Sequence, residues 1–263
     1  MRQKLTPVVK YLLIINGTML LLTFLLQSAG VIDLNKVLGL FYFKSEYFNP
    51  FQIITHMFMH GGFIHLLFNM YALYLFGTIL EKVMGAKRFL FFYLFTGLGA
   101  AALHTAYSWY IIQDFYNSVQ LFIVDSSLLN FETLVNTFPQ YFNAQSADGI
   151  IENWSSYNIN DIRNLVNDVL QHRMNIPTVG ASGAVFGLLL AFGVMFPDIP
   201  LMLFFVPIPI KAKYFVIGYG LLELFTGMSN FQGDNIAHFA HLGGMLFGFI
   251  LLKIWYKGNL KQM

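Results

Sequence analysis

Six long apolar stretches constrain the fold of this chain more than any other feature. A helix needs about 20 mostly apolar residues to cross a hydrocarbon core of roughly 30 Å. Stretches that meet or approach this length lie at residues 8–28, 62–80, 88–108, 180–196, 213–229 and 236–256. Only 11% of the 263 residues are charged, whereas a soluble protein carries about 25%. We therefore predict an all-α integral membrane protein with six transmembrane helices.

The first stretch has a second interpretation, because it follows basic residues as a secretory signal peptide does. Ser28-Ala29-Gly30 could then serve as a cleavage site. The apolar run is longer than the roughly 7 to 15 residues of a usual signal sequence, however, so we expect it to be retained as the first span. Because no organelle-targeting extension precedes it, we expect a prokaryotic plasma (inner) membrane.

The distribution of Lys and Arg predicts the orientation, since these residues gather in cytoplasmic loops. With a cytoplasmic N-terminus, 11 of the 15 cations face the cytoplasm: Arg2, Lys4, Lys10, Lys82, Lys87, Arg88, Lys211, Lys213, Lys253, Lys257 and Lys261. We therefore expect both termini to be cytoplasmic. On the same side, an apolar hairpin containing Pro197, Pro200, Pro207 and Pro209 should join the fourth and fifth spans.

Residues 109–177 differ from the rest of the chain, because acidic residues outnumber Arg163 and Arg173 there. The predicted orientation places this insertion on the extracytoplasmic side, within a single domain of residues 1–263. Apolar residues recur at helical spacing after Asn160 or Asp161 as a possible N-cap, which predicts an amphipathic helix. They are Ile162, Leu165, Val166 and Leu170.

Polar side chains within the spans mark a candidate functional site, because they are costly at membrane depth. His65 and Asn69 are four residues apart and share a helix face. Ser182 begins the fourth span, and His238 and His241 begin the sixth. The predicted orientation places all of them near the extracytoplasmic surface.

Close helix packing could bring Ser182 to a histidine of the sixth span. Pairs of glycines four residues apart allow two backbones to approach closely, and both spans have one: Gly183 with Gly187, and Gly244 with Gly248. A serine hydrogen-bonded to an imidazole is a nucleophile with its general base. The free N–H groups at a helix start near Ser182, with His65 and Asn69, could stabilise the oxyanion of an acyl transfer.

Other chemistries fit the sequence less well. A soluble hydrolase would carry G-x-S-x-G on a strand-to-helix turn, but glycine follows Ser182 immediately. A metal site could combine His56 and His60 with the other histidines, but H-E-x-x-H is absent and no carboxylate adjoins them in sequence. The chain has no cysteine, a net charge of +2 and no basic cluster, so we expect neither a thiolate nucleophile nor a nucleic-acid partner.

Three separated motifs stand out: His56-Met57-Phe58-Met59-His60-Gly61-Gly62 leading to His65-Leu66-Leu67-Phe68-Asn69, then Gly180-Ala181-Ser182-Gly183, then Ala240-His241-Leu242-Gly243-Gly244. Together they resemble the motifs of the rhomboid intramembrane serine proteases. The resemblance implies a six-helix rhomboid fold and a serine endopeptidase without metal or cofactor. Its substrates would be membrane proteins, cleaved in or near a transmembrane segment.

The resemblance also implies roles for individual residues. Ser182 would be the nucleophile and His241 the base, in a dyad without a third carboxylate. His65, Asn69 and the Ser182 backbone N–H would form the oxyanion hole. The residues that follow His241 favour it as the base and leave His238 a supporting or water-organising role.

Further positions match the family less directly. His56 and His60 match structural loop positions that would hydrogen-bond the first external loop and Glu81. Gly180 and Gly183 belong to the serine motif. Phe186 stands where some relatives have a tyrosine that stacks on the base, so stacking is expected without the hydroxyl.

Several alternatives stay open. Glu223 in the fifth span could be paired inside the bundle or take part in a lateral gate, and His104 should be structural. The insertion at 109–177 is longer than in the simplest relatives and could shape substrate entry. The rivals to a protease are a non-catalytic rhomboid-like protein that binds membrane clients and a small-solute transporter, although the chain shows no internal repeat of the kind transporters have.

Overall fold

The computed structural model describes residues 4–203, 206–229 and 237–256. They form two compact units: unit 1 consists of Met1–Leu40, Asn49–Thr105 and Pro177–Met263, and unit 2 of Phe41–Phe48 and Ala106–Ile176. Arg2, Lys257, Lys261 and the predicted start of the sixth span at residue 236 lie outside the described residues.

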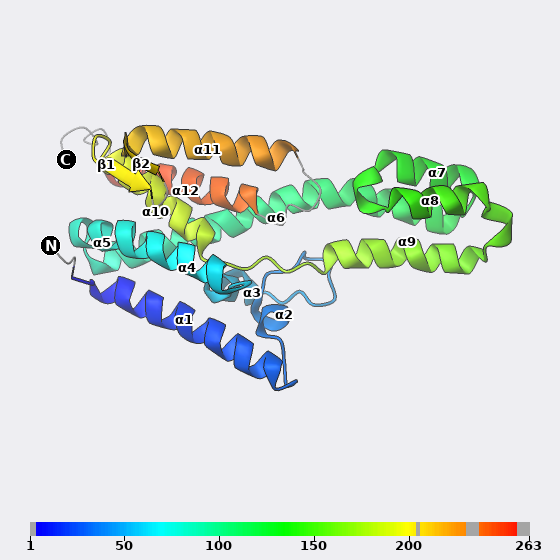
Figure 1. Ribbon diagram of the computed structural model, residues 1–263, viewed down its shortest axis with the longest axis horizontal. Coiled ribbons are helices and arrows are strands. Elements are labelled where there is room, and N and C mark those ends of the chain that lie inside the picture. Colours follow the sequence, from blue (N-terminus) through cyan, green and yellow to red (C-terminus); the bar gives the residue numbers. More distant parts are fainter. Residues whose placement is uncertain (1–3, 204–205, 230–236, 257–263) are drawn as a thin grey trace. The chain divides into compact units, whose positions relative to one another are not determined.

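Unit 1 is built mainly from helices that lie side by side (Figure 1). Its elements are α1 (Pro7–Ser28), α2 (Leu34–Leu38), α3 (Gln52–Thr55), η1 (His56–Phe58), α4 (Phe63–Ala72), η2 (Leu73–Gly77), α5 (Thr78–Met84), the first part of α6 (Ala86–Val124), α10 (Ser182–Met195), β1 (Pro200–Leu203), β2 (Val206–Lys211), α11 (Ala212–Ser229) and α12 (His238–Tyr256). The element η2 is a π-helical turn that joins α4 to α5, so these three elements form one helix.

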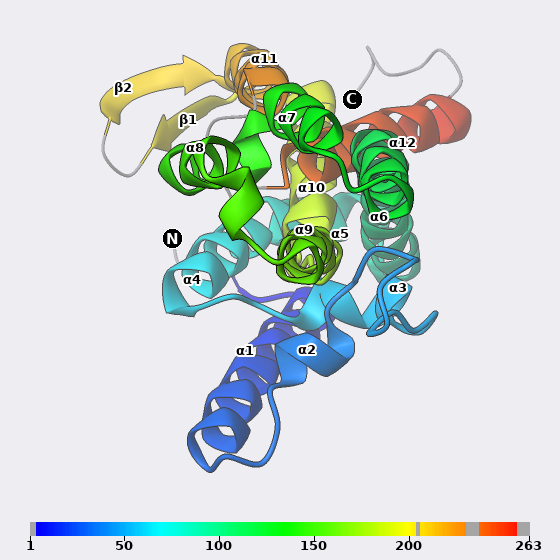
Figure 2. The same ribbon diagram turned by 90° about the vertical axis from the view of Figure 1, so that its right-hand side faces the viewer.

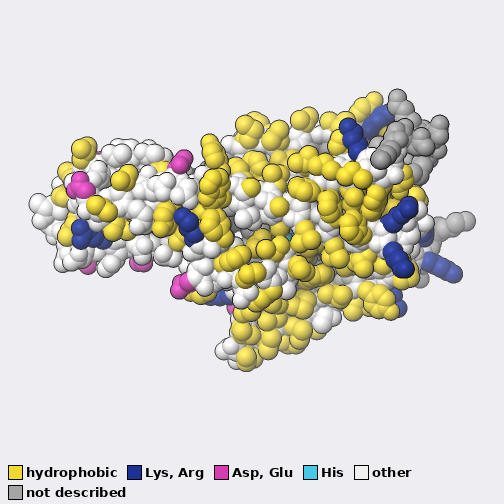
Figure 3. All heavy atoms as spheres, turned by 180° about the vertical axis from the view of Figure 1, so that it is seen from behind, with side chains coloured by type: hydrophobic (Ala, Val, Ile, Leu, Met, Phe, Trp, Pro, Cys, Tyr) yellow, Lys and Arg dark blue, Asp and Glu magenta, His cyan; other side chains and the backbone are white. Residues whose placement is uncertain are grey.

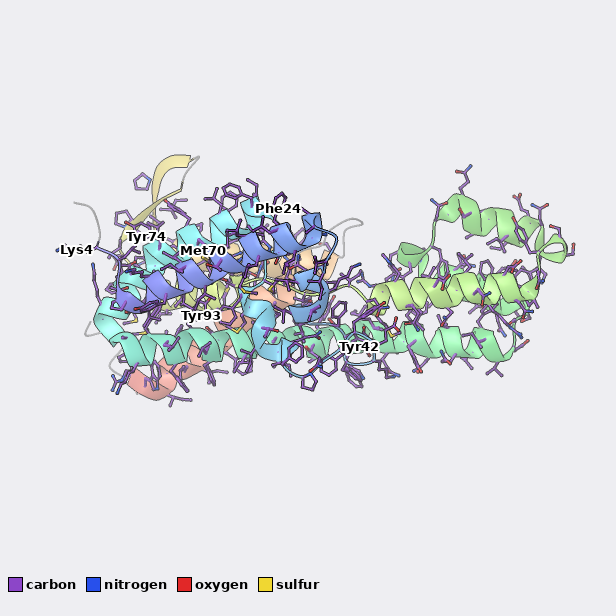
Figure 4. The ribbon with its side chains drawn as sticks, turned by 90° about the horizontal axis from the view of Figure 1, so that it is seen from below. Lys4, Phe24, Tyr42, Met70, Tyr74 and Tyr93 are labelled. Carbon is purple, nitrogen blue, oxygen red and sulfur yellow. The ribbon has the colours of Figure 1, made fainter. Side chains whose placement is uncertain are left out.

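Within the part of the chain that the structure describes, four helices are long and apolar enough to cross a membrane: Pro7–Ser28, Phe63–Met84, Ala86–Val124 and His238–Tyr256. The predicted fourth and fifth spans correspond to α10 and α11, which this set does not include. Large apolar side chains point outward from the helices of unit 1, as in Tyr11 and Phe24 of α1, which are 63% and 64% exposed. Figure 3 shows apolar side chains along the sides of this unit, and Phe24 is labelled on α1 in Figure 4.

The core of unit 1 lies around α10. Eleven of the 14 residues of this helix are buried, which is expected of a helix that is apolar on all sides and enclosed by others. Figure 2 shows α10 near the middle of the helices of unit 1. The same core cluster includes Val9 and Leu12 of α1 and the fully buried Tyr93 of α6, which is labelled in Figure 4.

Glycines let α10, α12 and α6 approach closely. A Cβ on Gly244 of α12 would collide with the backbone carbonyl of Gly183 in α10, and one on Gly248 would lie 3.4 Å from the Cα of Gly187. A Cβ on Gly183 would collide with Ala100 of α6. The predicted pairing of the two small-residue faces is therefore confirmed.

The third predicted span is longer than expected. Helix α6 does not end near residue 108 but continues to Val124. Buried apolar residues recur three or four positions apart in this extension, so the helical pattern persists after the residues become more polar. These residues are Ile112, Phe115, Val119 and Phe122.

The segment between α10 and α11 corrects the all-α prediction, because it forms an antiparallel two-stranded sheet. Strands β1 and β2 pair Pro200 with Lys211 and Leu201 with Ile210. Proline has no N–H to donate, and the free edges of a two-stranded sheet tolerate it better than a helix interior does.

Unit 2 has its own apolar core, made by the end of α6 with α7 (Leu128–Thr137), η3 (Pro139–Tyr141), α8 (Ala144–Glu152), η4 (Trp154–Ser156) and α9 (Ile159–Met174). Tyr42, labelled in Figure 4, belongs to this core. The predicted amphipathic helix is α9, but its N-cap is Asn158, whose side chain accepts a hydrogen bond from the N–H of Asn160. Ile162, Val166 and Leu170 are buried as expected, whereas Leu165 is 42% exposed.

We predict that Gly244→Ala lowers the free energy of unfolding by about 1–3 kcal/mol, the usual cost of overpacking a filled interior. The added methyl group would meet backbone atoms of Gly183, which cannot turn aside as a flexible side chain can. Thermal unfolding in detergent measures this. The matched control is Gly218→Ala in α11, where a Cβ meets nothing within 4 Å; it should be neutral or stabilise by up to about 1 kcal/mol. Equal unfolding temperatures for the two variants would contradict the predicted close contact.

Candidate active site

The start of α10 and the first turn of α12 bring Ser182 and His241 together. The Oγ of Ser182 lies 2.9 Å from the Nε2 of His241, within the range for a serine hydrogen-bonded to its base. Ser182 is partly buried and His241 is 8% exposed. The short distance depends on the backbone contact between Gly183 and Gly244, which lie next to or near the two residues in sequence.

The second ring nitrogen of His241 faces a carboxylate. Its Nδ1 lies 2.9 Å from the Oε2 of Glu223 in α11, and the same oxygen lies 2.6 Å from the Nδ1 of His238. The expectation of a base without a carboxylate neighbour is therefore wrong. The expectation that Glu223 could be paired inside the bundle is confirmed, but the sequence does not identify its partners, because residues 223 and 241 belong to different helices. A lone carboxylate in an apolar span is nevertheless a signal for such a site.

The ring of Phe186 lies flat on the imidazole of His241. Their centroids are 4.0 Å apart and the two planes differ by 5°. Phe186 is one turn after Ser182 on α10, so the same helix supplies both the hydroxyl and the stacking ring. The predicted stacking is confirmed.

His65 of α4 lies beside Ser182 because Gly180 has no side chain. A Cβ on Gly180, whose φ is +134°, would be 3.0 Å from the Nε2 of His65 and 3.6 Å from the Oγ of Ser182. The Nδ1 of His65 lies 3.4 Å from the N–H of Gly61, as an acceptor of a long hydrogen bond. This contact favours the tautomer with the proton on Nε2, the nitrogen beside Gly180.

Asn69 is 5% exposed and lies one turn after His65. Its Nδ2 donates a hydrogen bond of 2.9 Å to the backbone carbonyl of His65, and the amide carries a second hydrogen. Other donors come from the backbone, because the first N–H groups of α10 have no partner within the helix. Of the residues predicted for an oxyanion hole, His65 thus lies beside Ser182, and Asn69 is bonded to His65 one turn further along α4.

Backbone hydrogen bonds fix the segment that leads into Ser182. Thr178 exchanges both backbone hydrogen bonds with Leu40, and the N–H of Gly180 donates to the carbonyl of His56 over 2.9 Å. The Oγ1 of Thr178 also lies 2.8 Å from the Nε2 of His104, which agrees with a structural role for this histidine. A cavity of about 20 Å³ lies between this segment and Ser182, which is enough space for a water molecule.

His56 and His60 are buried in the first loop, as predicted, but neither of them bonds to Glu81. The Nδ1 of His56 bonds to the carbonyl of Gln52 over 2.9 Å. Burial, together with the neighbouring His65, lowers the pKa of His60 to about 4, so His60 is neutral at pH 7. Glu81 instead accepts hydrogen bonds of 3.0 and 2.9 Å from the backbone N–H groups of Val8 and Val9, because it lies at the far end of the helix that starts at Phe63.

Among the described residues, Glu223, His238 and His241 could also hold a metal ion. One ligand atom from each lies within 4.8 Å of the others. The hydrogen bonds of Glu223 to both imidazoles already pair these atoms. The geometry therefore allows either a hydrogen-bonded cluster or a metal site.

The chain is similar to known proteins of one family. A Rhomboid domain matches residues 47–112 and 133–258, which is more than half of the chain. The relatives include the "Putative rhomboid protease YdcA" of Bacillus subtilis (strain 168), 33% identical over 36% of this chain and 47% of that protein. Another is "RHOMBOID-like protein 12, mitochondrial" of Arabidopsis thaliana, 26% identical over 80% of this chain and 47% of that protein. The chain spans less than half the length of these relatives.

The matched residues include Ser182, His241 and most of the helices of unit 1. The apolar helices described above make the chain a membrane protein. The chain belongs to the rhomboid family.

Proposed function

We propose that this protein is an intramembrane serine endopeptidase that uses Ser182 as nucleophile and His241 as general base. The observation that supports this most strongly is the 2.9 Å contact between the Oγ of Ser182 and the Nε2 of His241, made by two different helices. Because the Nδ1 of His241 faces a carboxylate, its proton resides there and Nε2 is free to accept the serine proton.

The reaction follows from this geometry. As the Oγ of Ser182 attacks the scissile carbonyl carbon, its proton moves to the Nε2 of His241. The backbone N–H groups at the start of α10, the Nε2–H of His65 and the amide of Asn69 stabilise the oxyanion. His241 then gives its proton to the leaving amine, which leaves an acyl-enzyme on Ser182. A water molecule, deprotonated by His241, hydrolyses this ester and restores the serine hydroxyl.

The substrates are proposed to be transmembrane segments of other proteins. Helix α10 has 14 residues and is about 21 Å long at 1.5 Å per residue, shorter than a hydrocarbon core of roughly 30 Å. Its first residue, Ser182, therefore lies in a protein-lined hollow below the membrane surface. A peptide bond within a helix is shielded by its own hydrogen bonds, so the substrate must unwind locally and should contain small or helix-weakening residues near the cleavage site.

For the topology we propose six spans, formed by α1, the helix Phe63–Met84, the first part of α6, α10, α11 and α12. Lys and Arg side chains gather at the end of unit 1 where α1 starts and α12 ends (Figure 3). By the positive-inside rule this end faces the cytoplasm. The active site then opens to the extracytoplasmic side, and the segment 109–177 lies on that same side of the membrane. The membrane is proposed to be a prokaryotic plasma membrane.

We predict that Ser182→Ala and His241→Ala each lower the rate of cleavage of a membrane-anchored reporter by at least about 10³-fold, because each removes one partner of the nucleophile–base pair. Ser182→Ala should also abolish labelling by a fluorophosphonate. Both variants should unfold at temperatures close to that of the wild type. The matched control is Ser229→Ala, an exposed serine in α11, which should cleave and label normally.

A wild-type protein that neither cleaves the reporter nor reacts with the fluorophosphonate would refute the protease proposal in favour of a non-catalytic client-binding protein. Labelling that persists in Ser182→Ala would show that another residue is the nucleophile.

We also predict that the ring at position 186 contributes to kcat. Phe186→Leu removes the aromatic ring whose centroid lies 4.0 Å from that of His241. It should lower kcat by about 10-fold or more, because a misplaced general base lowers the reaction rate steeply. Phe186→Tyr keeps the ring and should retain most activity. Steady-state kinetics on the same reporter distinguish the two variants, and equal kcat values for Leu and Tyr would contradict a role for stacking.

A further inference from the structure

We propose that Glu223 is the third member of a catalytic triad, a positioning residue that holds the imidazole of His241 in the orientation and tautomer that activate Ser182. This inference rests on the proposed function. It adds a carboxylate that the rhomboid resemblance did not imply, supplied by a helix that carries neither the nucleophile nor the base.

The contacts form a continuous chain of hydrogen bonds. The Oε2 of Glu223 lies 2.9 Å from the Nδ1 of His241, and the Nε2 of the same ring lies 2.9 Å from the Oγ of Ser182. A carboxylate can only accept, so Nδ1 must donate and Nε2 must be the acceptor. This is the tautomer that a general base requires, and the stacked ring of Phe186 holds the imidazole plane from one side.

The burial of Glu223 is difficult to explain without such a role. The residue is 5% exposed, on a helix whose neighbouring side chains Leu221, Leu222 and Phe225 are 53–65% exposed and apolar. A carboxylate at membrane depth is costly unless it is paired, and such residues usually mark function. Glu223 lies on the buried face of α11 together with Val216 and Gly227.

The backbone around Glu223 is arranged so that its side chain reaches the histidines. Gly227, one turn after Glu223, allows α12 to approach, because a Cβ there would lie 2.9 Å from the Cβ of His238. The same carboxylate oxygen bonds to the Nδ1 of His238 over 2.6 Å. His238, which is one turn before His241 on α12, thus holds the carboxylate of Glu223 in place.

The test compares Glu223→Gln with the wild type in reporter cleavage and in the rate of fluorophosphonate labelling. The glutamine amide can donate to Nδ1 and favour the wrong tautomer. The corresponding exchange of aspartate for asparagine in a soluble Ser-His-Asp triad lowers kcat about 10⁴-fold with the geometry intact. We expect kcat and the labelling rate to fall by about 10²- to 10⁴-fold, with KM changed by less than about 3-fold. Glu223→Asp, which keeps the carboxylate, should recover part of the loss.

The matched control is Glu152→Gln, the same exchange at an exposed glutamate of α8, which should leave both rates unchanged. If Glu223→Gln does not fold, the wild type still provides a test. In ¹⁵N-histidine-labelled protein, a downfield Nδ1 proton resonance should be present and should disappear in His241→Ala; its absence from the wild type would overturn the proposal.

The remaining outcomes separate this inference from the proposed function. A folded Glu223→Gln variant with wild-type kcat overturns the triad and leaves the protease intact. Loss of activity on treatment with a chelator, restored by Zn²⁺, also overturns it, because the cluster would then hold a metal. A wild-type protein without Ser182-dependent labelling refutes the protease itself.

Discussion

The close contact between the backbones of α10 and α12 is the constraint on which the candidate site depends. Side chains on two neighbouring helices usually keep the axes 8–10 Å apart. Here the contact is made by glycines, which have no side chains: Gly183, Gly187, Gly244 and Gly248. The side chains of Ser182 and His241 can therefore meet. In lipid there is no hydrophobic force to drive two apolar helices together, and packing of this kind provides much of the attraction.

The polar residues of the bundle are arranged around this contact. Glu223 hydrogen-bonds to both His238 and His241, and His65 lies beside Gly180 and Ser182 from another helix. A polar group that found no partner in such an apolar interior would be costly. Satisfying these groups in one cluster reduces that cost and also fixes their orientation, so the arrangement that stabilises the polar residues is also the one that prepares them for chemistry.

What depends on local pattern or on the motifs could be predicted from the sequence. The Ser182–His241 contact and the stacked Phe186 were expected from the motifs, and the glycine faces from their four-residue spacing. A paired Glu223 inside the bundle was also among the expectations, but nothing near residue 223 in the sequence indicates that its partner is a histidine 18 positions later. The pairing of β1 with β2 was not predicted, because it joins two short segments whose prolines argue against any regular structure.

The hydrogen bonds of Glu81 have a consequence for the biogenesis of the protein. The N-terminus of α1 is not capped by a local side chain, since Thr6 makes no such bond. Its N–H groups are bound instead by a carboxylate 72 and 73 positions later in the chain. During synthesis these two N–H groups therefore cannot meet their acceptor until the helix Phe63–Met84 has been made, and the start of α1 becomes anchored only when that helix has packed beside it.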